Sequence, residues 1–320
     1  MSRKFKNIDN TGFSANSTSE GARVMNADGT PNIRKTGLSF LNRLSIYHTL
    51  LRMPRAKFLL LIFAWYTTLN LTFAGIYYLI GIQHLVGPDI PHSTFGKLTE
   101  AFFFSSQTLT TVGYGHIAPS GLSTNVIASI ESFMGILMFA LVTGIFYGRF
   151  SRPRAYILFS EKMLIAPFQS GRALMIRLAS FKNNHLTDIE GIMTAAVHEE
   201  VNGKRVTHYY TLKLNIAKVN SLALSWTVVH VLDEDSPLYN YSEEDLRKTK
   251  LEVILNIKGF DDHFSSTVQQ RTSYTIQQLV YGAKFMPMYR QSDDGDHTVL
   301  ELDKITDYET VRLPEPVFAN

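Results

Sequence analysis

Two long stretches of this chain carry almost no charged side chains, and they constrain its fold more than any other feature. There is no Asp, Glu, Lys or Arg from Phe58 to Pro88, and only Glu131 from Ala101 to Gly148. The run from Phe58 to Gly81 can cross a hydrocarbon core of about 30 Å as one helix. The run from about Val126 to Tyr147 predicts a second spanning helix. We therefore expect a membrane protein and not a soluble protein with a buried apolar helix.

The charges that flank these stretches predict the orientation of the chain. Residues 1–57 carry ten Lys and Arg against three Asp and Glu, and three arginines follow the second span at once. The segment between the spans has few charges. By the positive-inside rule both termini are cytoplasmic, which predicts a multi-pass protein of the cell (inner or plasma) membrane.

Composition excludes several other classes of function. The 320 residues include no cysteine, so neither a disulfide scaffold nor a cysteine nucleophile is available. A formal net charge of +3 gives no global field for nucleic acid. We find no nucleophile–base or metal constellation, so we predict neither an enzyme nor a bound cofactor.

Beyond Pro153 the chain has the pattern of a soluble all-β domain. Apolar or alternating runs of strand length, such as Ala173 to Ser180 and Leu251 to Phe260, are separated by turn-like clusters. Short strands without long helical patterns between them predict a β-sandwich. No glycine-rich dinucleotide fingerprint follows a strand. The first 35 or so residues are polar and are predicted to be poorly ordered.

The segment between the two spans carries the chemistry. Its first half, about Leu98 to Leu109, is apolar but too short to span, which predicts a re-entrant pore helix. The pentapeptide that follows, Thr111 to Gly115, reads Thr-Val-Gly-Tyr-Gly and matches the potassium-channel filter. The resemblance implies K⁺ sites at Thr111, Val112, Gly113 and Tyr114.

The physical requirements of such a filter agree with these residue types. A dehydrated K⁺ needs rings of oxygens, and neighbouring carbonyls can face one axis only if some residues adopt left-handed backbone angles. Gly113 and Gly115 tolerate these angles, and Thr111 can add a hydroxyl oxygen. One copy cannot enclose an axis, so a cyclic homotetramer is expected.

Residues 40 to 315 resemble the inward-rectifier potassium channels, and more specifically their bacterial, KirBac-type members. No Arg-periodic voltage sensor precedes the pore. Besides the filter, the resemblance rests on four motifs, at Leu50–Pro54, Gly148–Pro153, Asp233–Leu238 and Gln270–Tyr274. It implies a membrane α-helical pore of two transmembrane helices and a re-entrant pore helix, followed by a C-terminal all-β immunoglobulin-like cytoplasmic domain.

The resemblance also places the expected domain boundaries. A partly disordered N-terminal segment would cover residues 1–40, an interfacial slide helix 41–57, the transmembrane pore domain 58–150 and the β-sandwich 151–320. Within the pore domain we expect an outer helix at about 58–82, the pore helix at about 98–109, the filter at 111–115 and the inner helix at about 122–150.

The chain departs from the eukaryotic family pattern around the filter. Gln107 and Ile117 replace the pore-helix Glu and its basic partner, so another contact must support the filter, and Gln107 and Glu131 are the candidates for it. Glu131 is the one acid within the membrane, which indicates a function. We favour a hydrogen bond that supports the filter over direct contact with the ion.

Several positions of the inner helix share one helical face, which the resemblance makes the cavity lining. Phe139 lies where strong rectifiers have an acid, so block by Mg²⁺ or polyamines, and hence rectification, is expected to be weak. Thr143 lies on the same face. Tyr147 is predicted to form the bundle-crossing gate, although packing against a neighbour is an alternative. For Gly135 and Gly144 we favour packing over hinge function.

Two more groups of residues are candidates for regulation. Val268, Gln269 and Gln270 lie where the family forms its cytoplasmic loop gate. Six basic residues flank the spans, where each gains about 1 kcal/mol near anionic lipid. They set the topology and are also candidates for a site for anionic lipid or phosphoinositide: Arg52, Arg55, Lys57, Arg149, Arg152 and Arg154.

Together these features predict a tetrameric, passive K⁺-selective channel that is gated from the cytoplasmic side by anionic lipid. One alternative keeps the pore but adds a ligand-sensing module, so that conduction requires a nucleotide or an ion. Another is a membrane-anchored binding protein whose pore segment does not conduct. The intact filter argues against the latter.

Overall fold

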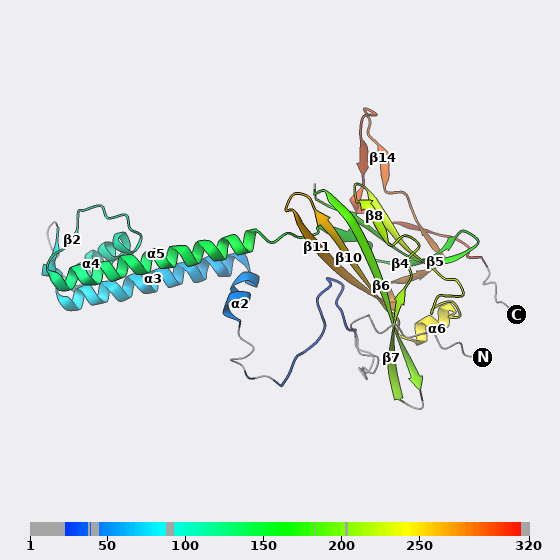
Figure 1. Ribbon diagram of the computed structural model, residues 1–320, viewed down its shortest axis with the longest axis horizontal. Helices are drawn as coiled ribbons and strands as arrows, with labels where there is room; N and C mark the ends of the chain where they lie inside the picture. The colour runs from blue at the N-terminus through cyan, green and yellow to red at the C-terminus, as the bar shows by residue number, and fades with distance from the viewer. Residues whose placement is uncertain are drawn as a thin grey trace. The chain divides into compact units, whose positions relative to one another are not determined.

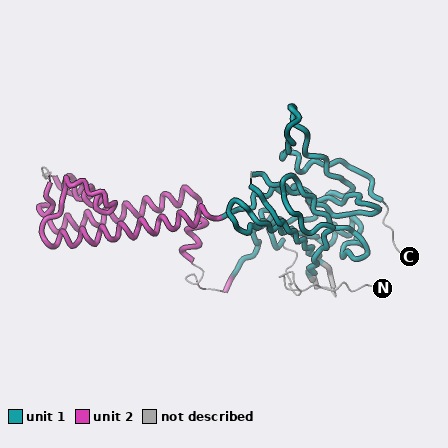
Figure 2. Tube along the Cα trace, turned by 45° about the horizontal axis from the view of Figure 1, so that its top comes forward, with its two compact units in different colours: residues 1–35, 153–320 teal, residues 36–152 magenta. Residues whose placement is uncertain are grey.

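The computed structural model describes residues 23–37, 39, 45–87, 93–182, 184–201 and 204–314. The chain forms two compact units (Figure 2). One is helical and covers residues 36–152, and the other combines the N-terminal segment up to Lys35 with residues 153–320.

The helical unit contains the two predicted spans. Within the described residues, two helices are long and apolar enough to cross a membrane, with mean hydropathies of 1.6 and 2.0. They run side by side, and a shorter helix lies beside one end of the pair (Figure 1). Strands β1 and β2 pair antiparallel, before and after the filter loop. The elements are α2 (Ile46–Arg52), α3 (Arg55–Ile80), β1 (Leu85–Val86), α4 (Thr94–Leu109), β2 (Ala118–Pro119) and α5 (Leu122–Phe150).

Local signals explain where the helices begin and end. The pore helix α4 starts four residues before the expected Leu98, because Ser93 is its N-cap and accepts a hydrogen bond from the amide of Gly96 at 3.0 Å. The expected slide helix over 41–57 is divided by Pro54, which lacks an amide hydrogen and precedes α3. Residues 41–44 of that prediction lie outside the described residues.

The C-terminal unit is a β-sandwich of two five-stranded sheets. In the first, the order is β11-β10-β6-β7, with β8 also paired to β6; in the second it is β12-β4-β5-β3, with β9 also paired to β5. All pairs are antiparallel except β12 with β4. The strands are β3 (Ile157–Phe159), β4 (Met163–Phe168), β5 (Gly171–Ser180), β6 (Leu186–Val201), β7 (Lys204–Leu212), β8 (Lys218–Ser221), β9 (Ser225–Val231), β10 (Glu252–Asp261), β11 (Ser266–Thr275) and β12 (Leu279–Tyr281).

The sandwich core lies between these sheets. Inward-facing side chains such as Ile176, Leu178, Met193 and Leu255 are fully buried in one cluster. Their alternation along each strand is the pattern that predicted a sandwich from the sequence. A short helix, α6 (Glu243–Lys248), is capped by Ser242.

The last part of the chain packs beside the second sheet as two small strand pairs, β13 (Ala283–Phe285) with β16 (Tyr308–Thr310) and β14 (Tyr289–Gln291) with β15 (Thr298–Leu300). Arg177 of β5 is buried and donates to the carbonyls of Ile305 and Lys304 at 2.9 and 2.7 Å. The carbon atom of its guanidinium also lies 4.5 Å from the ring centre of Phe285, within the range of a cation–π contact. This arginine attaches the C-terminal segment to the sandwich.

The N-terminal segment differs from the expectation of poor order. Residues 23–32 form a hydrogen-bonded turn, with a bridge between Met25 and Pro31 and a bond from the amide of Asn32 to the carbonyl of Val24 at 2.8 Å. This turn contacts strands β10 and β11. The expectation of disorder is therefore wrong for residues 23–32, and residues 1–22 lie outside the described residues.

Candidate functional site

The filter loop follows α4 without a break. Thr111, Gly113 and Gly115 have φ angles of +59°, +54° and +77°, so alternate residues adopt the left-handed region. The amides of Val112 and Gly113 both donate to the carbonyl of Gln107, at 2.9 and 3.2 Å. Positive φ was expected at the two glycines, whereas at Thr111 the backbone has a conformation that a β-branched residue rarely adopts.

The pore helix also holds the loop through a side chain. Gln107 is buried, and its Oε1 accepts a hydrogen bond from the amide of Tyr114 at 3.3 Å. The structure thus brings Gln107 to the filter backbone, at the position from which the sequence predicted filter support. Val112 and Tyr114 are 52% and 81% exposed, so the described residues of one chain leave both side chains largely uncovered.

Glu131 lies in a buried polar network that joins three helices. Tyr77 of α3 donates its hydroxyl to Glu131 Oε2 at 2.6 Å, and Ser105 of α4 lies within hydrogen-bonding distance of both Glu131 Oε1 and Asn70 Oδ1. Both Glu131 and Ser105 are fully buried. The carboxylate therefore contacts the pore helix through Ser105, and its support of the filter stays a prediction.

Sequence reasoning missed the partners of Glu131. Asn70, Tyr77 and Ser105 are polar residues in otherwise apolar helices, and each is buried. In a bilayer such groups need partners, so their presence opposite a single acid is the signal that could have identified them.

The inner helix touches the pore helix at Gly135. A Cβ added there would lie 1.8 Å from the carbonyl oxygen of Leu109, so only glycine permits this approach. No atom lies within 4 Å of the corresponding position at Gly144. Packing within the chain therefore explains why residue 135 is a glycine, but it does not explain the glycine at position 144.

The predicted cavity residues Phe139, Thr143 and Tyr147 are exposed in the single chain, and Phe139 and Tyr147 are each 74% exposed. They remain available for a pathway formed between several copies.

The six predicted basic residues fall into two groups. Arg149 donates to the carbonyls of Leu50 and Met53, the latter at 2.6 Å, and its guanidinium carbon lies 4.4 Å from the ring centre of Phe58. It thus binds the C-terminal end of α2, where carbonyls lack helical partners. The side chains of the other five are exposed, namely Arg52, Arg55, Lys57, Arg152 and Arg154.

The expected loop gate needs correction. Residues 268–270 lie within strand β11, paired with β10, and not in a loop. Val268 is 4% exposed and belongs to the sandwich core, and the side chain of Gln270 bonds to the backbone of Ile157. Only Gln269 of the three is exposed. The turn that follows β10 lies at 262–265 instead.

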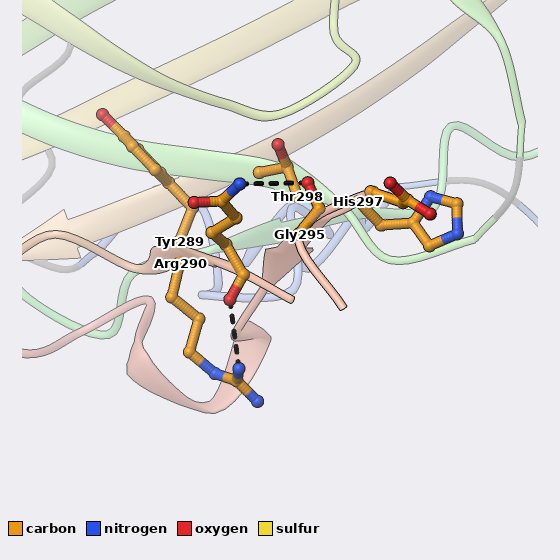
Figure 3. A pocket seen from close by; sticks show the side chains of 7 residues that line it. Tyr289, Arg290, Gly295, His297 and Thr298 are labelled. Carbon is orange, nitrogen blue, oxygen red and sulfur yellow. Dashed lines mark hydrogen bonds between the residues drawn. The ribbon is translucent and has the colours of Figure 1, made fainter. Parts of the chain in front are cut away.

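A shallow pocket lies on the β14–β15 hairpin (Figure 3). In it Gln291 donates to the carbonyl of Gly295 at 3.0 Å, and Arg290 donates to the carbonyl of Gln291. It contains none of the predicted site residues and is lined by Tyr289, Arg290, Gln291, Gly295, Asp296, His297 and Thr298.

Comparison with known proteins identifies the family to which this architecture belongs. Residues 157–319 match the model of the inward rectifier potassium channel C-terminal domain, and residues 65–152 match that of an ion channel. This chain belongs to the inward rectifier potassium channel family. The family model covers half of the chain, and the resemblance noted from the filter and its flanking motifs is confirmed.

Individual relatives agree with this assignment. The inward rectifier potassium channel Kirbac3.1 of Paramagnetospirillum magnetotacticum is 33% identical over 88% of this chain and 94% of its own length. The channel irk-1 of Caenorhabditis elegans is 24% identical over 92% of this chain, which spans 58% of that relative. The mouse ATP-sensitive inward rectifier potassium channel 10 is 28% identical over 86% and 78%.

The family settles the general activity. The chain is a membrane ion channel that transports K⁺, and it is not an enzyme. Its fold is the expected pair of transmembrane helices with a re-entrant pore helix, followed by an immunoglobulin-like C-terminal domain.

Proposed function

We propose that this protein is a homotetrameric, K⁺-selective channel of the cell membrane that conducts passively and is gated by anionic lipid from the cytoplasmic side. The observation that carries the proposal is the loop from Thr111 to Gly115, whose backbone alternates into the left-handed region and is held by Gln107. Such a loop at membrane depth is tolerated only where it is buried in protein or lines a water-filled path, and its exposed backbone fits an ion path.

The exposure of the filter supports a tetramer. Val112 and Tyr114 are largely exposed in one chain, although both belong to an apolar segment. Four copies around an axis would bring four loops together and cover the outward-facing rings of Tyr114. The K⁺ ligands would be the oxygens of Thr111, Val112, Gly113 and Tyr114.

The inner helix supplies the proposed cavity and gate. Phe139, Thr143 and Tyr147 would line the path below the filter, and four Tyr147 rings could close it by excluding water. Because Phe139 carries no charge, block by Mg²⁺ or polyamines, and therefore rectification, would be weak.

The exposed basic residues support regulation by lipid. Arg52, Arg55, Lys57, Arg152 and Arg154 flank the two spans and stay free to meet anionic headgroups or phosphoinositides at the cytoplasmic surface. Their position also supports cytoplasmic termini. Arg149, by contrast, would act on the interfacial helix α2, because its guanidinium binds the carbonyls of Leu50 and Met53.

Uptake of radioactive Rb⁺ into liposomes tests this function. Uptake should be competed by external K⁺ but not by Na⁺, and should change with the fraction of anionic lipid. If a verified wild-type tetramer shows no uptake, the uptake of the Tyr147→Ala variant is measured, and this variant should restore flux if the gate of the wild type is closed. Absence of Rb⁺ uptake in both the wild type and Tyr147→Ala would contradict the proposal.

A further inference from the structure

Two consecutive serines of the pore helix α4 bond to different partners. Ser105 is fully buried and bonds to Asn70 of α3 at 3.2 Å and to Glu131 of α5. Ser106 is half-buried, and its Oγ lies 2.6 Å from the hydroxyl oxygen of Tyr66 of α3. The bond between Tyr66 and Ser106 is therefore a second polar contact between the outer helix and the pore helix, beside the network of Glu131.

The outer helix presents one polar face to these serines. Tyr66 and Asn70 are four positions apart on α3, so their side chains lie on the same side of the helix. The side-chain amide of Asn70 donates to the carbonyl of Tyr66 at 2.8 Å, and its Oδ1 accepts from Ser105. Both serines are thus held by neighbouring turns of the same helix.

Contacts on consecutive residues fix the rotation of the pore helix about its own axis. Successive residues of an α-helix are about 100° apart around the axis. One hydrogen bond leaves the helix free to turn about that contact, whereas two bonds in different directions oppose such a turn. Because each Cα atom lies about 2.3 Å from the axis, a rotation of about 10° would move it by about 0.4 Å.

The residue that follows Ser106 holds the filter. The carbonyl and the side chain of Gln107 together accept from the amides of residues 112–114. The carbonyl of Ser106 itself accepts from the amide and the hydroxyl of Thr110, at 3.1 and 2.7 Å. A displacement of Ser106 would therefore reach the filter backbone through two adjacent residues.

We propose that Tyr66 is a positioning residue for ion selection, which acts through Ser106 to hold the last turn of the pore helix, and with it Gln107, at the angle that the filter requires. A binding site needs its groups within about 0.5 Å of the working geometry, so a rotation of about 10° uses most of this tolerance. In the part of the chain that the structure describes, the hydroxyl of Tyr66 bonds to Ser106 and not to Glu131. Its effect on selectivity rests on the proposed K⁺ selectivity, whereas its effect on the filter backbone does not.

Removal of a single hydroxyl tests this role with little change of shape. Tyr66→Phe keeps the ring and deletes the bond to Ser106. Tyr78→Phe is the matched control, further along the same helix at a side chain that is 38% exposed. In the full-length reconstituted channel, the K⁺-to-Na⁺ permeability ratio, measured from reversal potentials, should fall about threefold or more in Tyr66→Phe. It should stay at the wild-type value in Tyr78→Phe, and a wild-type ratio in Tyr66→Phe would overturn the proposal.

Ser106→Ala tests whether Tyr66 acts through Ser106. Each single variant and the double variant remove the same bond, so all three should have the same permeability ratio. Ser129→Ala is the control, because this exposed serine bonds within its own helix, to the carbonyl of Asn125 at 2.9 Å. Effects of the two single variants that multiply in the double variant would show that the residues act independently, and would overturn the route through Ser106.

Hydrogen exchange separates positioning of the filter from a general loss of stability. In Tyr66→Phe the amides of residues 112–114 should exchange faster, while those of the inner helix α5 should exchange as in the wild type. Unchanged exchange at the filter, or equally faster exchange along α5, would overturn the positioning role. If the wild type conducts Na⁺ as well as K⁺, the proposed selectivity fails, and exchange at residues 112–114 alone decides whether Tyr66 positions the filter.

Discussion

The hydroxyl of Tyr77 lies 2.6 Å from Oε2 of Glu131, and this contact joins the outer helix to the inner helix behind the pore helix. Ser105 of the pore helix binds the other carboxylate oxygen. Because these groups are surrounded by apolar side chains, each depends on the others for its hydrogen bonds.

Replacing Glu131 should weaken the pore domain and the filter together. Glu131→Ala leaves Tyr77 without its acceptor and leaves Ser105 with Asn70 alone, and an unsatisfied buried group costs about 1–3 kcal/mol. We expect a lower melting temperature of the purified channel and a lower preference for Rb⁺ over Na⁺ in uptake.

Glu131→Gln keeps one acceptor oxygen and the shape of the side chain, so its losses of stability and of selectivity should be smaller than those of Glu131→Ala. Equal stability and selectivity in Glu131→Ala and the wild type would show that the network does not support the filter.

The contact between Gly135 and Leu109 predicts a position-specific effect of a methyl group. Gly135→Ala must displace the inner helix or the last turn of the pore helix, and overpacking of this kind costs about 1–3 kcal/mol. Differential scanning fluorimetry should show a lower melting temperature, and the uptake assay should show a lower Rb⁺ flux.

Gly144→Ala is the matched control for this prediction. It lies on the same helix, and among the described residues outside its own helical turn no atom lies within 4 Å of an added Cβ, so the variant should retain the wild-type melting temperature. A larger loss of stability at Gly144 than at Gly135 would contradict the packing role of Gly135.

Arg149 and Arg152 should have different functions although both follow the second span. Lys at position 149 cannot bridge the carbonyls of Leu50 and Met53, because it lacks the planar fork of donors. Arg149→Lys should therefore reduce flux several-fold while the channel binds as many anionic lipids as the wild type in native mass spectrometry.

Arg152→Ala should instead change lipid binding, because the side chain of Arg152 is exposed. Fewer bound anionic lipids and a weaker lipid dependence of flux are expected. Loss of bound lipid in Arg149→Lys but not in Arg152→Ala would contradict this division.

His230 predicts that the C-terminal domain loses stability in acid. Its Nδ1 bonds to the carbonyl of Lys213 at 2.7 Å and its Nε2 to the hydroxyl of Ser236 at 2.8 Å. Burial lowers the pKa of His230 below its usual value near 6.5. Below a pH of about 6.5 the imidazole of His230 binds a proton in the unfolded chain more readily than in the folded chain. The free energy of unfolding therefore falls as the pH decreases below about 6.5.

Urea unfolding of the full channel at pH 7.5 and 5.5 measures this effect. Burial also lowers the pKa of His198, so His230→Asn should reduce the pH dependence without abolishing it, by at most about 1.4 kcal/mol per pH unit. His297→Asn, at an exposed position, should leave it unchanged. If the free energy of unfolding of His230→Asn depends on pH as strongly as that of the wild type, His230 is not a source of the acid sensitivity.

The sequence predicts most of the membrane unit because its constraints are local. Absence of charge from Phe58 to Pro88 and the order of residues from Thr111 to Gly115 need no long-range information. The start of the pore helix at Thr94 was missed because the cap at Ser93 is a short polar signal beside an apolar run.

Contacts between distant residues were not predictable in the same way. Arg149 looked like one of six equivalent basic residues until its carbonyl partners 96 and 99 positions earlier were seen. Val268 was misplaced because the alternation of β11, and not its position in a motif, directs its side chain into the core. The polar N-terminal segment gave no sign of its binding to Glu252, 227 and 228 positions away.

The most direct test of the central claim is the reversal potential of the reconstituted channel in a planar bilayer with K⁺ on one side and Na⁺ on the other. A K⁺-selective filter at Thr111 to Gly115 predicts a reversal potential far toward the K⁺ equilibrium potential, and its collapse toward zero in Gly113→Ala. A wild-type reversal potential near zero, with measurable current, would contradict the account.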